Sequence, residues 1–451
     1  MPSSLPRRHA LKLFGGATAL GMTTVLGSRA ADRARHPVAG AAPAASGTGP
    51  AAPPPIGLRS TMQGLVTGPT RVGAWAAAPV AGDSGRPALG FTECTVRMVV
   101  RTSVGGTAPR IRLSNLSGTG PLLVESATIG VRAKDSSAVS GSLSRVFFGG
   151  SHRAVVPRGG ELLSDPIAIR RPIAARDALL VSLYLPGPTG PATWHPRSQD
   201  ATHIAPGDRT EDGSGRRFTD AQTGWFYLSG LDLVSPVATG TVVCFGDSIT
   251  DGAAPSLTQV GGRWSDALAT RIAKARPDRP LGVVDLGIAA NMLLTDNSGT
   301  TAGRSGLNRF RQDALEQTGL TDVIVLEGIN DIRQGKDGAG GPLTAAALIA
   351  GYRTLIRQAR AVGAAVHGGT VTPFQGDSRY SAAGEHVRQQ VNKWIRTGGE
   401  FDSVADFDRA IRDPAHPARY RPSYDRGDHL HPGAAGYTAL AAAVDLAALR
   451  G

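Results

Sequence analysis

The stretch TVVCFGDSITDG, residues 241–252, joins an apolar run to a short polar segment that carries Ser248. A serine hydroxyl is a weak nucleophile unless a base takes its proton, a third group orients that base, and donors stabilise the oxyanion that forms on attack. A strand-to-helix turn would also use a serine at this place. Ser248 is therefore a candidate nucleophile, and its interpretation depends on residues elsewhere in the chain.

A candidate base and a group to orient it stand together in GDHLHPGAAGY, residues 427–437. Asp428 and His431 are three residues apart, a spacing that lets both side chains face one side of a helical turn. Asp428 can then hold one imidazole nitrogen while the other faces Ser248, which sets the tautomer and stabilises the imidazolium. His429 competes as the base, but its adjacency to Asp428 directs it to the opposite side, so we predict His431.

The same segment has a second interpretation, because His429 and His431 beside Asp428 are residue types that bind zinc. No other cluster of histidines or cysteines in the sequence completes a ligand set. We therefore expect no metal and no cofactor.

Donors for an oxyanion are expected where neighbouring strands end, in VVDLGIAAN (283–291) and VIVLEGIND (323–331). Gly287 has no side chain, so its backbone N–H can approach a substrate oxygen, and the Asn330 amide can donate into the same crevice. Taken singly, each has a structural explanation: a glycine that ends a strand and an asparagine that caps a turn. Together they favour an oxyanion site.

These residues need a scaffold, and the sequence after residue 240 alternates between strand and helix patterns. Trp264, Leu268 and Ile272 recur at helical spacing between two of the apolar segments. This alternation predicts a parallel, doubly wound sheet, in which reacting groups collect outside the carboxyl ends of the strands. The expected strands are 241–245, 282–286, 322–326, 365–371 and 403–407.

The region before it, from about 60 to 237, consists of short alternating segments broken by Gly and Pro. In CTVRMVVRT the side chains of Cys94, Val96, Met98 and Val100 share one face. Such a series of short strands predicts an antiparallel β-sandwich.

Four arginines at alternate positions of that region are expected to form the solvent-facing side of a sheet, with a binding face as the alternative. They are Arg97, Arg101, Arg110 and Arg112. The net charge of +12 comes mainly from scattered arginines, without a basic stripe or a phosphate-binding GxxxxGK[ST] motif. We therefore exclude nucleic acid as a partner.

The N-terminal segment, residues 1–30, has the features of a twin-arginine export signal: Arg7 and Arg8, a weakly apolar stretch, and small residues before Ala30. The stretch from Leu13 to Gly27 is shorter than the roughly 20 residues that span a bilayer. We expect a secreted protein without a stable membrane span, with a retained N-terminal anchor as the alternative. Residues 31–58, rich in Ala, Pro and Gly, are expected to form a linker.

Two cysteines, Cys94 and Cys244, are too few for a disulfide framework. Cys244 lies within the apolar run before Ser248, where a small buried thiol is the expected state. We therefore expect both to be free, with a bridge between Cys94 and Cys244 as the alternative.

Four blocks, GDSIT, LGIAAN, GIND and DHLHP, occur in the order that is typical of one enzyme family, and the chain resembles the SGNH (GDSL-type) hydrolases. The resemblance implies a three-layer α/β/α, flavodoxin-like domain with a parallel sheet over residues 238–451, preceded by an all-β sandwich over 59–237. It implies Ser248 as nucleophile, His431 as base and Asp428 as the orienting group. It also implies an oxyanion hole from the N–H groups of Ser248 and Gly287 and the Asn330 amide.

The segments VRTSVGG, IRLSN and LYLPGPTGPATWH are similar to those of a subgroup of secreted bacterial xylan esterases and acylhydrolases. Two positions depart from the family pattern: Ile249 replaces the commoner Leu, and Ala290 stands where Gly is expected, which weakens the role of Gly287. Asp247 is expected to brace the loop through backbone hydrogen bonds.

The resemblance implies a secreted serine esterase that forms an acyl-enzyme and hydrolyses short acyl, above all acetyl, esters on carbohydrate. Two alternatives stay open: a lipase or phospholipase that acts on longer acyl chains, and a catalytically inactive polysaccharide-binding protein. The sequence leaves the natural ester and the oligomeric state open.

Overall fold

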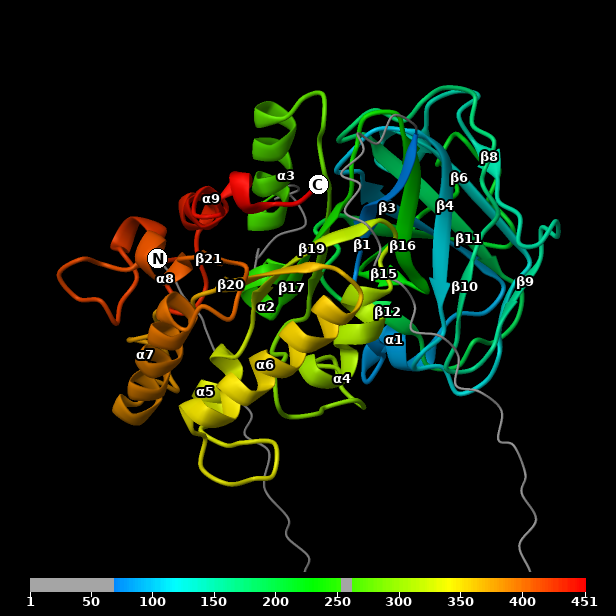
Figure 1. Ribbon diagram of the computed structural model, residues 1–451. Coiled ribbons are helices and arrows are strands. Elements are labelled where there is room, and N and C mark those ends of the chain that lie inside the picture. The colour runs from blue at the N-terminus through cyan, green and yellow to red at the C-terminus, as the bar shows by residue number, and fades with distance from the viewer. Residues whose placement is uncertain (1–68, 253–261) are drawn as a thin grey trace, which may run out of the picture. The chain divides into compact units, whose positions relative to one another are not determined.

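A computed structural model describes residues 69–252 and 262–451 (Figure 1). The predicted export signal, residues 1–30, and the predicted linker, residues 31–58, lie outside the described residues. Within the described residues, no helix is both long and apolar enough to cross a membrane.

The N-terminal half is β-rich, as the sequence predicts, and its two largest sheets are antiparallel. The four-stranded sheet has the order β1 (Thr70–Ala76), β16 (Leu228–Ser235), β4 (Thr107–Ser114), β10 (Glu161–Leu163). The seven-stranded sheet has the order β14 (Asp220–Thr223), β13 (Ala201–Pro206), β3 (Cys94–Arg101), β11 (Ala178–Leu185), β6 (Ser126–Lys134), β7 (Ser137–Ala138), with β8 (Ser144–Arg145) beside β6.

Short strands and one helix complete this half. They are β2 (Val80–Ala81), β12 (Thr193–His195) and β15 (Trp225–Phe226) in one small sheet, β5 (Leu122–Val124) and β9 (Ala154–Val156) in another, and helix α1 (Gly85–Leu89). Both large sheets contribute to one apolar core, which contains Val72 and Leu231 from the first sheet and Val96 and Val181 from the second. The predicted shared face of β3 is confirmed, because Cys94, Val96, Met98 and Val100 all lie in this core.

The prediction that the alternate arginines face solvent is wrong for Arg97, whose side chain is completely buried. Its guanidinium donates hydrogen bonds to Ser182 Oγ (2.8 Å) and to the carbonyls of residues 136, 209, 210 and 212, and it lies 4.0 Å from the ring centre of Phe218. Burial lowers the pKa of Arg97 to about 10. A long loop therefore covers this part of the sheet, which period-two patterning could not reveal; Arg101 is exposed.

The C-terminal half is α/β, with a five-stranded sheet whose strands all run parallel. Its order is β18 (Gly282–Gly287), β17 (Thr241–Gly246), β19 (Leu320–Leu326), β20 (Ala365–Gly369), β21 (Ser403–Ala405). The order of appearance along the chain is thus 2-1-3-4-5, so the direction of winding reverses beside β17, the first strand. All five predicted strands are present, with ends shifted by a few residues.

Helices lie on both sides of this sheet: Figure 1 shows α3 and α9 on one side and α4 and α6 on the other. Trp264, Leu268 and Ile272 are completely buried in α3, as their spacing predicts. The helical segments are α2 (Ser248–Asp251), α3 (Trp264–Ala275), α4 (Gly306–Phe310), η1 (Arg311–Leu315), α5 (Ile329–Gln334), α6 (Ala345–Ala361), α7 (Ala382–Thr397), α8 (Phe407–Ile411), η2 (Pro422–Tyr424), α9 (Ala434–Ala442) and η3 (Leu446–Ala448).

Strand β1 of the β-rich half packs against the parallel sheet. The Gly73 N–H donates to Thr241 Oγ1 (2.9 Å), and the Val283 N–H donates to Ser103 Oγ (2.9 Å).

Both cysteines are free and buried, Cys94 in the β-rich core and Cys244 in the α/β core.

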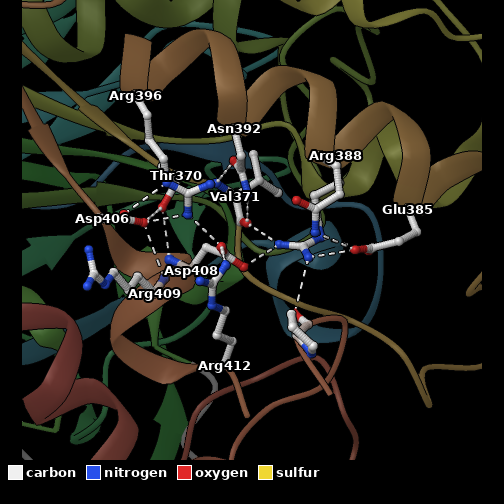
Figure 2. A network of polar contacts seen from close by, with 12 residues as sticks. Thr370, Val371, Glu385, Arg388, Asn392, Arg396, Asp406, Asp408, Arg409 and Arg412 are labelled. Atoms are coloured by element: carbon white, nitrogen blue, oxygen red, sulfur yellow. Dashed lines mark hydrogen bonds and ion pairs between the residues drawn. The ribbon is translucent and has the colours of Figure 1, made fainter. Parts of the chain in front are cut away.

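A network of ion pairs joins α7 to α8, as Figure 2 shows. The buried Arg388 pairs with Asp408 (2.6 Å) and Glu385 (2.8 Å), while Arg396 pairs with Asp406 and Asp408 (2.6 Å each). Removing one member of such a network would leave a buried charge uncompensated, which typically costs about 3–5 kcal/mol. The network therefore holds α8 in place, and α8 leads into the segment that carries Asp428 and His431.

Candidate active site

The candidate nucleophile lies where β17 ends. Strand β17 is buried throughout and ends at Gly246, where a Cβ atom would lie 2.2 Å from the Leu326 carbonyl oxygen, so only glycine fits. Asp247 is the N-cap of α2, and its carboxylate accepts a hydrogen bond from the Ile249 N–H (2.9 Å), the bracing role expected of it. Ser248 is the first residue of α2, at the positive end of the helix.

The structure brings Ser248, His431 and Asp428 together in one chain of hydrogen bonds. Ser248 Oγ lies 2.8 Å from His431 Nε2, and His431 Nδ1 lies 2.8 Å from Asp428 Oδ2. With Nδ1 donating to the carboxylate, Nε2 carries a lone pair toward the serine hydroxyl. This tautomer is the one that can take a proton from Ser248.

The backbone around His431 is held by its neighbours. Asp428 Oδ1 accepts the N–H groups of Leu430 (3.1 Å) and His431 (2.8 Å), so the orienting carboxylate also shapes the turn. The buried hydroxyl of Tyr420 donates to the Leu430 carbonyl (2.7 Å). The imidazole is thus positioned through both its ring and its main chain.

His429, the competing base, has a different partner. Its Nδ1 lies 2.5 Å from Asp425 Oδ2, and about half of its side chain is exposed. Its φ of +61° is in the left-handed region, which is uncommon for residues other than glycine. The structure therefore places His431, and not His429, against Ser248.

Burial and nearby charges affect the acidity of both groups. Burial lowers the pKa of His431 below its ordinary value; Asp428 opposes this shift, and the charges of Arg426 and Arg197 add to it. Burial alone would raise the pKa of Asp428, but its hydrogen bonds from His431 and Leu430 hold that pKa below the ordinary value. At neutral pH the pair is thus a neutral imidazole beside a carboxylate, ready to accept a proton.

Asn330 lies beside the loop that follows β18. Its Nδ2 donates to the Asn291 carbonyl (2.9 Å), and its Oδ1 accepts from Arg333 (3.0 Å). An amide nitrogen carries two hydrogens, so Asn330 keeps a second N–H for another acceptor. The adjacent Asp331 accepts the N–H groups of Leu293 and Leu294 and so holds the same loop against α5.

Gly287 ends β18, but its N–H donates to Asp285 Oδ1 (3.0 Å) within its own strand. A Cβ atom at Gly287 would lie 2.1 Å from the Asp251 nitrogen, so glycine permits close packing of α2 on β18. Ala290, where Gly is expected, has φ +60° and is exposed. The structure thus packs Gly287 against α2 and leaves Ala290 at the surface of the loop beside Asn330.

Residues 244–439, which contain Ser248, Gly287, Asn330, Asp428 and His431, match the GDSL-like lipase/acylhydrolase family. The chain carries a GDSL-like lipase/acylhydrolase domain. The protein is therefore an ester hydrolase of the SGNH type, and the β-rich half lies outside the matched residues.

The GDSL-like domain also has solved structural neighbours. A carbohydrate acetylesterase from Sinorhizobium meliloti is 19% identical (TM-score 0.35; 45% of this chain, 94% of that one), and an acetyl xylan esterase from Geobacillus stearothermophilus is 21% identical (TM-score 0.35; 46% and 93%). A GDSL-like lipase from Bacteroides thetaiotaomicron is 18% identical (TM-score 0.34; 47% and 88%). No curated protein matches the chain.

Sequence reasoning missed Arg309, which connects the strand ends of the GDSL-like domain. Its buried guanidinium donates to the carbonyls of Gly246 and Leu286 (2.8 Å each) and pairs with Glu327 (3.4 Å). Burial and the charge of Asp331 raise the pKa of the neighbouring Asp247 to about 7. An arginine in a short helical segment has no sequence signal for this role, because its partners come from three strands.

A second group that the sequence did not predict comes from the β-rich half. His195, directly before the loop after β12, bonds through Nε2 to Asp251 Oδ1 (3.0 Å), the last residue of α2 in the GDSL-like domain. Arg263 contacts the same carboxylate (3.4 Å), and Arg197 lies 3.6 Å from its other oxygen.

Among the described residues there is no cluster of three or more histidine, cysteine or acidic side chains arranged to hold a metal ion.

Proposed function

We propose that this protein is a secreted serine esterase that hydrolyses short acyl, above all acetyl, esters on carbohydrate, with Ser248, His431 and Asp428 as its catalytic residues. The observation that carries the catalytic assignment is the hydrogen-bonded chain from Ser248 Oγ through His431 to Asp428, with both distances at 2.8 Å. We propose that these residues lie on a three-layer α/β/α, flavodoxin-like domain. The parallel strand order and the helices on both sides of the sheet support this fold.

In the first half-reaction, Ser248 Oγ attacks the acyl carbon and its proton passes to His431 Nε2. Asp428 stabilises the resulting imidazolium through its bond to Nδ1. When the tetrahedral intermediate collapses, the bond to the alcohol breaks and His431 returns the proton to the leaving oxygen. In the second half-reaction, water attacks the acyl carbon and gives one proton to His431 Nε2. When this second intermediate collapses, the bond between the acyl carbon and Ser248 Oγ breaks, His431 returns the proton to Oγ, and the acid leaves.

The oxyanion needs donors that are in place before the reaction. The Ser248 N–H at the start of α2 and the second N–H of Asn330 are suited to this role. For Gly287 to contribute, its N–H would have to leave Asp285. The loop from 288 to 291, which contacts Asn330, is the better source of a third donor, and we assign that donor to the exposed Ala290.

The substrate class rests on the resemblance to secreted bacterial esterases and on the polar surroundings of His431. The charged groups that act on its imidazole are Asp428, Arg426 and Arg197. Guanidinium groups donate well to the oxygens of a polar alcohol and gain nothing from a fatty chain. Export through a twin-arginine-type signal over residues 1–30 is part of the same proposal and rests on the sequence alone.

Two measurements test this proposal. Rates on p-nitrophenyl acetate and p-nitrophenyl palmitate compare short with long acyl chains; we expect a clear preference for acetate, and a preference for palmitate would make the protein a lipase. A fluorophosphonate probe should label the wild type stoichiometrically and the Ser248→Ala variant not at all. An unlabelled wild type would contradict the serine mechanism.

A further inference from the structure

The segment after β12 belongs to the β-rich half but is tied to the nucleophile helix. His195, at the end of β12, is buried; its Nδ1 lies 2.9 Å from the Ala78 carbonyl and its Nε2 lies 3.0 Å from Asp251 Oδ1. Asp251 is also buried and stands three residues after Ser248 in α2. The position of this segment is therefore linked to that of the nucleophile.

Arg263 adds a second connection. Its guanidinium donates to the backbone carbonyl of Arg197 (2.7 Å) and to that of Asp251 (2.5 Å), and it contacts the Asp251 carboxylate (3.4 Å). Because one buried guanidinium bonds both backbones, the segment and α2 are held in a single arrangement.

The side chain of Arg197 differs from those of its neighbours because 39% of it is exposed. Its Nε lies 3.6 Å from Asp251 Oδ2, and within the described part of the chain its terminal nitrogens Nη1 and Nη2 have no hydrogen-bond partner. Asp251 stands three residues after Ser248 in α2, so the guanidinium of Arg197 lies beside the helix that carries the nucleophile. Its charge is also one of the influences that lower the pKa of His431.

The reaction determines which side of the scissile bond Arg197 faces. In the proposed mechanism His431 returns the proton to the leaving oxygen, so the alcohol lies on the His431 side of the acyl carbon. A group near His431 is therefore near the alcohol and not near the acyl chain. A planar guanidinium can donate two parallel hydrogen bonds to neighbouring oxygens, and adjacent hydroxyls of a sugar ring offer such a pair.

We propose that Arg197, supplied by the β-rich half, is a specificity-determining residue that donates hydrogen bonds to the hydroxyl oxygens of a carbohydrate leaving group. This inference rests on the proposed function and deepens it, because it gives the β-rich half a direct part in substrate recognition. Esters whose alcohol has no such oxygens cannot use the interaction.

The test compares two acetyl esters, p-nitrophenyl acetate and acetylated xylooligosaccharides, on the wild type, Arg197→Gln and Arg197→Lys. The control is Arg158→Gln, an exposed arginine on the turn after β9. kcat and KM are measured above the titration of His431, so that a changed imidazole pKa does not enter. Thermal midpoints show whether each variant is folded.

We expect Arg197→Gln to lose roughly tenfold more kcat/KM on the oligosaccharides than on p-nitrophenyl acetate, mainly through KM, because a charge-assisted hydrogen bond is lost. Arg197→Lys should recover part of the difference, and Arg158→Gln should match the wild type on both esters. Equal losses on both esters with a lowered thermal midpoint would show a structural role and overturn the inference. A wild type that cleaves p-nitrophenyl acetate but not the oligosaccharides would instead contradict the proposed substrate.

Discussion

The α/β half contains two sets of Ser, His and Asp side chains with nearly the same hydrogen-bond distances. In one, His431 lies 2.8 Å from both Ser248 and Asp428. In the other, His367 lies 2.7 Å from Ser403 Oγ and 2.9 Å from Asp322 Oδ1. Composition and distance alone do not distinguish them.

The positions of the two sets in the fold distinguish them. Asp322, His367 and Ser403 lie within β19, β20 and β21, and His367 pairs in register with Ser403. His367 and Asp322 are buried, and Asp322 also accepts the Arg450 N–H (3.0 Å). This second set bonds one strand to the next.

The first set lies beyond the ends of the strands, where Ser248 begins α2 directly after β17, and Asn330 stands in the first turn of α5 after the neighbouring strand β19. Its ring orientation is also opposite, because Nε2 faces the serine in this set and Nδ1 faces the serine in the other. The comparison shows that hydrogen-bond distances among Ser, His and Asp do not by themselves identify a nucleophile, because the two sets differ in their place in the fold.

The sharpest test of this comparison exchanges each serine for alanine. Ser248→Ala should lower kcat by about 10⁴-fold or more, because the nucleophile is lost. Ser403→Ala should leave kcat/KM within about twofold, since its hydroxyl only bonds two strands. Both are measured with p-nitrophenyl acetate on folded protein. A large loss of kcat in Ser403→Ala would mean that the second set takes part in the reaction.

The two neighbouring histidines provide the next test. His431→Ala should cost about as much kcat as Ser248→Ala, because members of a catalytic unit are strongly non-additive. His429→Ala, which removes an exposed partner of Asp425, should cost less than about threefold, in line with a surface ion pair. If His429→Ala proved the more damaging change, the base would have to be reassigned.

Asn330→Ala should lower kcat by about 10²–10³-fold, the usual cost of one oxyanion donor. KM for p-nitrophenyl acetate should change little, because the donor acts mainly in the transition state. Asn330→Asp serves as the matched variant, since it keeps the size but replaces the donor by an acceptor. If Asn330→Ala and Asn330→Asp lost the same factor in kcat and also lowered the thermal midpoint by the same amount, Asn330 would only hold the 288–291 loop.

The pH profile should distinguish His431 from an ordinary surface histidine. A base with a lowered pKa is neutral over a wider pH range, and only the neutral imidazole can accept the serine proton. kcat/KM should therefore rise with pH through an inflection below 6.5 and stay level at neutral pH. An inflection above 6.5 would mean that Asp428 outweighs burial and the two arginines.

The smallest effect on activity is expected for His367→Gln. This change breaks the bonds of a buried imidazole to Ser403 and Asp322 and should lower the free energy of unfolding by about 1–3 kcal/mol. kcat of the folded enzyme should remain close to that of the wild type. Denaturant unfolding together with steady-state kinetics measures both quantities, and a selective loss of kcat would contradict a purely structural role.

Much of the α/β half was predictable because its elements have strong local signals. The apolar run before Ser248 and the helical spacing of Trp264, Leu268 and Ile272 both give the observed elements. The pairing of Asp428 with His431 follows from a three-residue separation, which a single turn can close. By contrast, Arg97 is predicted to face solvent but is buried, because the loop that covers it comes from residues more than 100 positions later in the chain.

The class of each half, the four motif blocks and the family they resemble depend on side-chain type and short-range spacing, so the amino-acid sequence predicts them. Which groups meet is a property of the fold: the Gly287 N–H bonds to Asp285, Arg309 connects three strand ends, and His195 reaches Asp251. A buried polar group must find a partner wherever the fold brings one. Those partners lie far apart in the chain, and no local pattern records them.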